Sequence, residues 1–408
     1  MNLLLLNLLL TLSTPLMIAY AFWGLANAPR LWRKYLPFLI LSVGMIAYCY
    51  EPVGHPDLVR YFEKINYCKD LTLKETFVYF NDNLFISNVL FWVAGKMGMP
   101  HLIPALSTMT VYGTASYITC DFSDRSGNSK AIVRVLLYLC CILPFVSIMN
   151  NVRNVCAFSL IILAVYRELV KKNRDLITIL LYILPCFIHM TGFILVLFRL
   201  VVILIGRQFF IAAGIVGLMP MAIKYIVEHL NMIPYMGGIG IIIRKALVTA
   251  YYAMNSSSKW ANTIMTSRYH LAQRYASFAV AVLFCVLLLF YSRKKNVETK
   301  EFYGYLGVVY IFTLGCNVFR TPAYWRFFAA GNIGISTLLT RVFCNNMMWS
   351  KKQLKLIKIV LWSFALVLLT LQLYGGRANI NLVSEISNVI IIPFPFVLIK
   401  MIVSLFYI

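Results

Sequence analysis

Two apolar runs joined by a polar turn occupy residues 132–170, which read IVRVLLYLCCILPFVSIMNNVRNVCAFSLIILAVYRELV. Each run is about as long as a helix must be to cross a hydrocarbon core of about 30 Å. A strand of a membrane barrel would instead alternate apolar and polar residues over about 10 positions. The stretch therefore predicts two consecutive membrane-spanning helices, and the Asn-Asn-Val-Arg-Asn turn at 150–154 predicts the point where they meet.

Similar apolar runs recur along the whole chain, which is 61% hydrophobic and only 12% charged. Its mean hydropathy of +0.80 lies far outside the range of soluble domains. We predict an all-α fold, a polytopic membrane helical bundle of about 12–14 transmembrane helices in one integral membrane domain over 1–408. The predicted spans are 3–25, 35–50, 101–119, 132–149, 155–170, 176–190, 191–206, 209–227, 276–291, 303–319, 327–344, 356–374 and 388–407. The first run lacks a basic segment before it, so we expect it to be retained as a span.

Basic residues set the predicted orientation. The net charge of +23 is explained by cytoplasmic loops and anionic lipid head groups, and nucleic acid is not expected as a partner. The clusters at 30–34, 171–174, 293–295 and 351–358 are predicted to be cytoplasmic, which places the N-terminus outside a bacterial inner membrane. To keep this arrangement, the apolar piece at 84–93 must be an interfacial or re-entrant helix.

Two predicted outer loops, 51–83 and 228–275, are long and contain aromatic residues. Loops longer than about 12–15 residues are uncommon unless they are functional or disordered. We expect both loops to be partly folded over the membrane surface. The working surface is therefore predicted to be extracytoplasmic.

The ten cysteines form no CxxC pair and have no histidine at zinc-ligand spacing. They are interpreted as small hydrophobic residues, and a Cys49–Cys68 disulfide is the one bridge to consider. No P-loop, dinucleotide fingerprint or metal-ligand cluster is present. We predict neither a metal nor a cofactor.

Two outer turns carry arginines directly before inward-running spans. Arg153 lies in the turn at 150–154, and Arg320, Tyr324 and Arg326 lie in Arg-Thr-Pro-Ala-Tyr-Trp-Arg at 320–326. Guanidinium groups beside the free N–H groups of a helix N-terminus form an anion site. The alternative is that these residues only anchor helix ends at the membrane interface. Arginine on the outer face runs against the positive-inside bias, which favours function.

Ionisable residues in the loops are further candidates. Asp57, Arg60 and Tyr61 would share a face if the segment after Pro56 is helical, although a capping Asp57 explains the pattern equally well. His189 ends one span and could be a base or a phosphate donor, or simply a satisfied interfacial histidine. The second loop adds His270 as a catalytic candidate, with Arg244 and Arg268 as candidates for binding an anion.

These motifs resemble those of the Wzy-type, EpsG-like polymerases of bacterial surface polysaccharide, such as lipopolysaccharide O-antigen and capsule. The resemblance extends over about residues 1–345 and depends on the order of four short motifs. They are Gly-x-x-Asp-Leu-x-Arg-Tyr at 54–61, Asn-x-x-Arg-Asn at 150–154, Ile188-His189 and the Arg-rich aromatic turn at 320–326.

The resemblance implies a membrane-embedded glycosyltransferase similar to the GT-C class. Its donor would be a growing glycan on undecaprenyl pyrophosphate, its acceptor an incoming lipid-linked repeat unit, and a chain-length regulator could be its protein partner. Asp57, His189 and His270 would then be catalytic, and the arginines and tyrosines named above would bind pyrophosphate or glycan. A flippase of lipid-linked oligosaccharides, and another membrane glycosyl or acyl transferase, are the alternatives; a flippase should show an internal repeat, which this chain lacks.

Overall fold

The computed structural model describes residues 14–52, 57–80, 84–205, 209–228, 267–292, 299–319, 321, 323–344 and 349–376. Several features predicted from the sequence lie outside these ranges. They are the span at 388–407, the basic cluster at 293–295, most of the loop at 228–275, Arg244 and Arg320.

Every regular element within these ranges is a helix, which confirms the predicted all-α class. The α-helices are α2 (Thr14–Asn27), α3 (Trp32–Tyr48), α4 (Asp57–Cys68), α5 (Leu73–Phe80), α6 (Phe85–Lys96), α7 (Leu102–Arg125), α8 (Ile132–Ile142), α9 (Phe145–Asn150), α10 (Val152–Leu169), α11 (Leu176–Ile183), α12 (Gly192–Ile205), α13 (Phe209–Glu228), α16 (Arg268–Ser292), α17 (Lys300–Val318), α18 (Tyr324–Gly334), α19 (Ser336–Phe343) and α20 (Lys351–Gly376). Three short 3-10 helices are η1 (Pro29–Leu31), η2 (Ser129–Ala131) and η3 (Leu184–Phe187).

Three of the predicted continuous spans are broken in the structure. The span at 132–149 divides into α8 and α9 because Leu143 is extended, with φ −90° and ψ 114°, before Pro144. Proline disfavours helical backbone at the preceding residue and has no N–H to donate. In the span at 176–190 the α-helix ends at Ile183 and the 3-10 helix η3 follows. The span at 327–344 is interrupted at Ile335, between α18 and α19. Continuous helices were the wrong prediction at these places.

Two described helices are long and apolar enough to cross a membrane, Arg268–Tyr291 in α16 and Lys351–Gly375 in α20. The other helices are shorter or less apolar by the same measure. The structure therefore establishes a helical bundle. Helix length and composition support two membrane crossings among the described helices, fewer than the sequence predicts.

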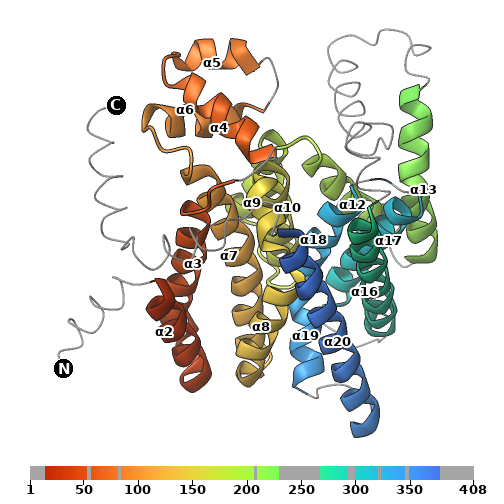
Figure 1. Cartoon of the computed structure of the whole chain (residues 1–408). Helices are drawn as coiled ribbons and strands as arrows, with labels where there is room; N and C mark the ends of the chain where they lie inside the picture. Colours follow the sequence, from red (N-terminus) through yellow and green to blue (C-terminus); the bar gives the residue numbers. More distant parts are fainter. Residues whose placement is uncertain are drawn as a thin grey trace, which may run out of the picture.

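Helices α4, α5 and α6 form a cap at one end of the bundle (Figure 1). The apolar piece at 84–93 lies in α6, which packs against α4 and α5. The Trp92 Nε1–H donates to the Leu71 carbonyl at 3.0 Å, and Lys96 Nζ donates to the Lys69 carbonyl at 2.8 Å. Gly95 allows the close approach of α6 to α4, because a Cβ there would collide with the Ile65 carbonyl oxygen.

The cap has its own apolar core, distinct from the larger core of the bundle. Tyr50, Leu58, Phe91, Met149 and Val152 are all buried in this smaller cluster. Because α9 and α10 contribute two of these side chains, burial of apolar surface fixes the cap over the start of α10. Cys49 and Cys68 are buried free thiols, so the disulfide considered from the sequence is not formed.

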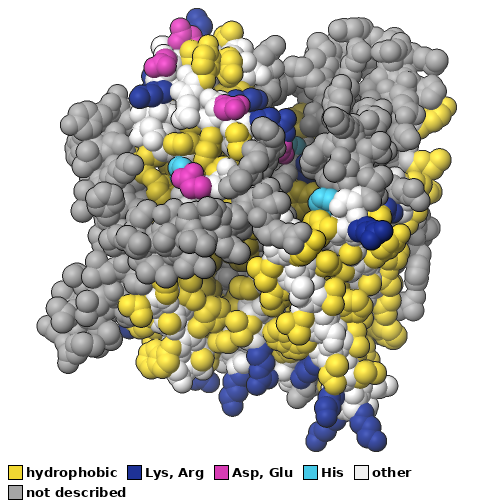
Figure 2. Space-filling model, viewed as in Figure 1, with side chains coloured by type: hydrophobic (Ala, Val, Ile, Leu, Met, Phe, Trp, Pro, Cys, Tyr) yellow, Lys and Arg dark blue, Asp and Glu magenta, His cyan; other side chains and the backbone are white. Residues whose placement is uncertain are grey.

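Lysine and arginine side chains gather at the end of the bundle opposite the cap (Figure 2). The turn between α2 and α3 meets the turn between α7 and α8 there, and the Trp32 Nε1–H lies 3.5 Å from Asp124 Oδ2. Ser123 and Thr340 lie 3.2 Å apart through their hydroxyls and bring the end of α19 to the same place. The described basic clusters therefore share one end, which we call the basic end: 30–34, 125–134, 171–174 and 351–358.

Asp121 is the main buried anion of the basic end. Its carboxylate accepts a hydrogen bond from Tyr166 Oη at 2.7 Å and pairs with Arg125 Nε at 3.0 Å and Lys171 Nζ at 3.4 Å. Lys171 also donates to Tyr117 Oη at 2.6 Å. A buried ion is tolerated only when it is paired and hydrogen-bonded, so this group joins α7 to α10 through matched charges.

Replacing Asp121 with Asn should destabilise the protein, because Lys171 then keeps its buried charge without a counter-ion. Breaking a buried pair typically costs about 3–5 kcal/mol. The measurement is the thermal unfolding midpoint in detergent. Asp70→Asn, in the exposed turn after α4, is the matched control and should leave the midpoint unchanged. Equal midpoints for the two variants would contradict the role given to Asp121.

Candidate functional site

Helices α10 and α18 begin next to each other at the capped end of the bundle. Helix α4 of the cap contacts α9, and the turn that follows η3 lies against α10. Four segments that are far apart in the sequence therefore meet at this place. They bring together five of the residues predicted from the sequence, namely Asp57, Tyr61, Arg153, His189 and Arg326.

Arg153 lies in the first turn of α10 and binds the cap. Its Nε donates to Tyr61 Oη at 3.3 Å, and its guanidinium carbon lies 5.0 Å from the centre of the Tyr61 ring. The centre of the Phe91 ring lies 5.9 Å from the same guanidinium carbon. These cation–π contacts orient the guanidinium at the helix N-terminus.

His189 is held by a short hydrogen-bonded chain. Its Nδ1 lies 2.7 Å from Thr191 Oγ1, and that hydroxyl donates to Asn154 Oδ1 at 3.0 Å. The backbone N–H of Thr191 donates to the same Nδ1 at 3.2 Å. These contacts fix the orientation of the imidazole ring at the site.

Two arginines act on this imidazole from different helices. Burial lowers the pKa of His189 well below its ordinary value of 6.5, and the positive charges of Arg153 and Arg326 lower it further. The imidazole is consequently neutral at pH 7. Two like charges from α10 and α18 thus converge on one neutral side chain, which is the arrangement of an anion site.

Arg326 lies in the first turn of α18, and its Nε is buried without a hydrogen-bond partner among the described residues. A buried donor left unpaired costs about 1–3 kcal/mol, and more when it is charged. Asp57 and Tyr61 of the cap act on Arg326 through longer-range electrostatic interactions. The positive charge of Arg326 is therefore partly compensated by Asp57, whereas its Nε donor still lacks an acceptor among the described residues.

The N-termini of α10 and α18 lack side-chain caps. Asn151 precedes α10 but donates its side-chain amide backward to the Ser147 carbonyl at 3.2 Å, and Ala323 precedes α18. The first backbone N–H groups of a helix have no partner within the helix and carry a partial positive charge. At α18 the Tyr324 and Arg326 N–H groups donate to the Thr321 and Ala323 carbonyls at 3.4 and 3.0 Å. The start of α10 is therefore the helix end that adds most to the attraction for an anion.

Asp57 begins α4 and forms an ion pair with Arg60, one turn further along the same helix. The segment after Pro56 is thus helical, as the sequence analysis supposed, and Asp57 and Arg60 share a face. Arg60 is mostly exposed, whereas Tyr61 turns inward to Arg153. Of these three residues, Asp57 and Tyr61 belong to the site and Arg60 lies at its rim.

The remaining candidates lie elsewhere or outside the described residues. Tyr324 is buried near Tyr269 and Arg274, and the His270 ring is tilted by 60° to the Tyr269 ring, with ring centres 4.7 Å apart. His270 and Arg268 lie in the first turn of α16. Arg244 and Arg320 are not described. Nowhere in the described ranges are three His, Cys, Asp or Glu side chains grouped as a metal site requires.

Several residues of the site were missed by sequence reasoning. Asn154 and Thr191 fix the His189 ring, Phe91 supports Arg153, and Asn150 donates to Tyr50 Oη at 3.4 Å beneath the cap. Asn154 and Thr191 stand beside Arg153 and His189 in the sequence, and this proximity was the available signal. Nothing local marks Phe91, which reaches the site only through the packing of α6.

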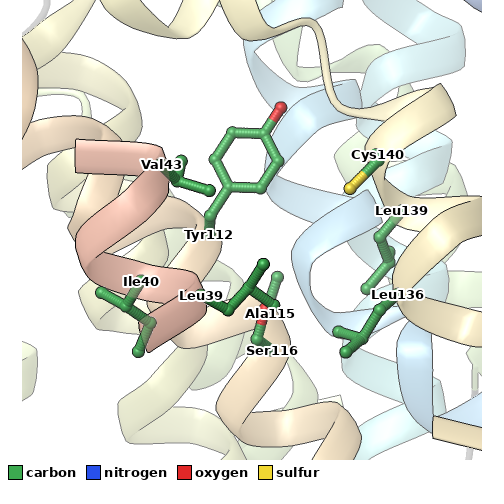
Figure 3. Close-up of a pocket in the computed structure, with 9 residues that line it drawn as sticks. All are labelled: Leu39, Ile40, Val43, Tyr112, Ala115, Ser116, Leu136, Leu139 and Cys140. Carbon is green, nitrogen blue, oxygen red and sulfur yellow. The ribbon is translucent and has the colours of Figure 1, made fainter. Parts of the chain in front are cut away.

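A small apolar pocket with a volume of about 20 Å³ lies between α3, α7 and α8 (Figure 3). Tyr112 lines the pocket, and its hydroxyl donates to the Leu143 carbonyl at 2.9 Å, where α8 ends before Pro144. The lining residues are Leu39, Ile40, Val43, Tyr112, Ala115, Ser116, Leu136, Leu139 and Cys140.

Comparisons with protein-family models, with characterised proteins and with solved structures find no match to this chain.

The low pKa of His189 predicts a pH-dependent loss of stability. The unfolded chain binds a proton near pH 6.5 and the folded chain does not, so the free energy of unfolding decreases as the pH falls below about 6.5. Each pH unit below that point should cost up to about 1.4 kcal/mol. His189→Gln cannot titrate and should lose less stability between pH 7.5 and pH 5.5, measured by thermal unfolding in detergent. An equally steep loss in both proteins would contradict a buried neutral imidazole.

Proposed function

We propose that this protein is a glycosyltransferase of the bacterial inner membrane that polymerises oligosaccharide repeat units carried on undecaprenyl pyrophosphate. In this reaction the growing glycan moves from its lipid carrier to the non-reducing end of an incoming lipid-linked unit. The order of the four sequence motifs supports the proposal, and the clustering of residues from all four around one site adds to it.

The observation that carries the proposal is the convergence of Arg153 and Arg326 on the neutral His189. A pyrophosphate needs several charge-assisted donors, and two guanidinium groups at two uncapped helix N-termini supply them. The unpaired Nε of Arg326 is available for such an acceptor.

The proposed reaction breaks the bond between the anomeric carbon of the donor and its pyrophosphate oxygen. The acceptor hydroxyl forms the new bond to that carbon, and the lipid pyrophosphate leaves with the electron pair of the broken bond. Arg153 and Arg326 stabilise the charge that develops on the leaving group. The proton of the acceptor hydroxyl goes to the neutral imidazole of His189.

Donor binding would itself make His189 a better base. Without a ligand, the two arginines and burial keep the pKa of His189 low. A bound pyrophosphate would neutralise both guanidinium groups and remove their repulsion of a protonated imidazole. The pKa of His189 would then rise toward its ordinary range, so the base would be competent only when the donor is in place.

Arg153→Lys and Arg326→Lys should each lose most polymerising activity, because lysine keeps the charge but not the planar, bidentate fork. Truncating one buried charge-assisted contact typically costs about 2–5 kcal/mol, or roughly 30-fold to several thousand-fold in rate. The measurement is the length of glycan formed from purified lipid-linked repeat units. Arg33→Lys, an exposed arginine at the basic end, is the matched control and should keep full activity.

If well-expressed Arg153→Ala and Arg326→Ala proteins still make long glycan, both arginines only anchor helix ends at the interface, and the proposal is refuted. A deletion strain separates the competing function. Loss of a polymerase leaves surface lipid capped by single repeat units, whereas loss of a flippase leaves none.

Orientation in the membrane gives a further prediction. The site and the cap should face outward and the basic end the cytoplasm, following the positive-inside rule. A membrane-impermeant maleimide should label Lys74→Cys in α5 on intact spheroplasts, and should label Asn173→Cys after α10 only once the membrane is permeabilised. Background from native cysteines is subtracted with the parent protein. Labelling of Asn173→Cys from outside would invert the orientation and remove the site from the outer face.

A further inference from the structure

Three helices without a single carboxylate meet at the basic end. Neither α8, α19 nor α20 contains Asp or Glu, and each packs against the other two. Together they carry six cationic side chains, namely Arg134, Arg341, Lys351, Lys352, Lys355 and Lys358. This contrasts with the neighbouring part of the basic end, where Asp121 neutralises Arg125 and Lys171.

A hollow on α20 lies within this cationic region. It is lined by Lys355, Lys358, Ile359, Trp362, Ser363 and Leu366. These positions recur at three- and four-residue intervals, so they form one face of the helix over about three turns. The lining changes along that face from lysine to Trp362 and Ser363, and then to the apolar Leu366, which is mostly exposed.

The wall and the rim of the hollow are fixed by contacts between the helices. Trp362 packs edge-on against Tyr138 of α8, with ring centres 5.5 Å apart. Lys358 Nζ donates to the Phe343 carbonyl at 3.4 Å, at the end of α19. Arg134 of α8 is exposed and acts electrostatically on Lys358, and both charges also act on the Cys344 thiol.

Two repelling cations are thus held near each other beside an apolar surface. The repulsion would be relieved by an anion placed between them. A free phosphate would satisfy the charges only, whereas an anionic phospholipid would also cover the apolar side of the hollow. Trp362 stands where such a lipid changes from head group to acyl chain, the level that tryptophan favours in membranes.

We propose that the hollow formed by α20 with Arg134 is a binding site for an anionic glycerophospholipid. The phosphodiester lies between Arg134, Lys355 and Lys358, and one acyl chain runs along Ile359 and Leu366. The site is independent of the proposed polymerase reaction, because it lies at the opposite end of the bundle from His189.

Thermal unfolding of the purified full-length protein in a non-ionic detergent tests the site, with phosphatidylglycerol as the probe. Phosphatidylglycerol should raise the unfolding midpoint, whereas phosphatidylcholine and inorganic phosphate should not. Lys355→Gln/Lys358→Gln should raise the half-stabilising concentration of phosphatidylglycerol about 30-fold, since each lysine contributes about fivefold to anionic lipid attraction. Lys351→Gln/Lys352→Gln removes the same charge from the same helix outside the hollow. This control should change the half-stabilising concentration of phosphatidylglycerol little.

If both lysine pairs shift the half-stabilising concentration equally, the effect comes from general surface charge and the proposed site is wrong. Stabilisation by inorganic phosphate alone, or by phosphatidylcholine as strongly as by phosphatidylglycerol, would also overturn it. If Lys355→Gln/Lys358→Gln does not fold, Arg134→Gln provides the second test from α8. It should weaken the phosphatidylglycerol response several-fold, and an unchanged response would contradict the proposal.

Discussion

A charged side chain inside an apolar bundle must find a counter-charge, and this requirement organises the structure around α10. Near its C-terminal end, Glu168 accepts two hydrogen bonds from Arg199 of α12, at 2.9 and 2.6 Å, and a third from Tyr182 of α11 at 2.7 Å. Tyr166, on the same helix, donates to Asp121 of α7. Pairing and hydrogen bonding offset the cost of burying these charges, and they join α10 to α7, α11 and α12.

The opposite end of α10 breaks this rule. Arg153 and Arg326 converge there on an imidazole that burial keeps neutral, and the Arg326 Nε has no acceptor in the described part of the chain. A buried polar group without a partner is costly, so a ligand that supplied an acceptor to this Nε would stabilise the capped end. The difference between the two ends of one helix is therefore the physical basis for placing the site at the capped end.

The cap makes the site an enclosed place. The small core formed by Leu58, Phe91 and Val152 holds α4 and α6 over the start of α10 and brings Tyr61 and Asp57 near the two arginines. Enclosure lowers the local dielectric and strengthens each guanidinium contact with an anion. At the other end, α8, α19 and α20 contain no carboxylate that could balance their lysines and arginines.

The sequence by itself determined the helices, because the length of an apolar run and the presence of proline are local properties. Residues 35–50 and 155–170 became α3 and α10 nearly as predicted, and Arg153 was recognised at a helix start from its turn alone. Local pattern did not reveal that Pro144 divides a span, since its effect depends on whether the helix kinks or ends. The tertiary structure alone decided that His189 lies with Arg153 and Arg326 while His270 lies with Tyr269, because these contacts join residues far apart in the chain. They are set by the packing of α10, α18 and the cap, which no single segment encodes.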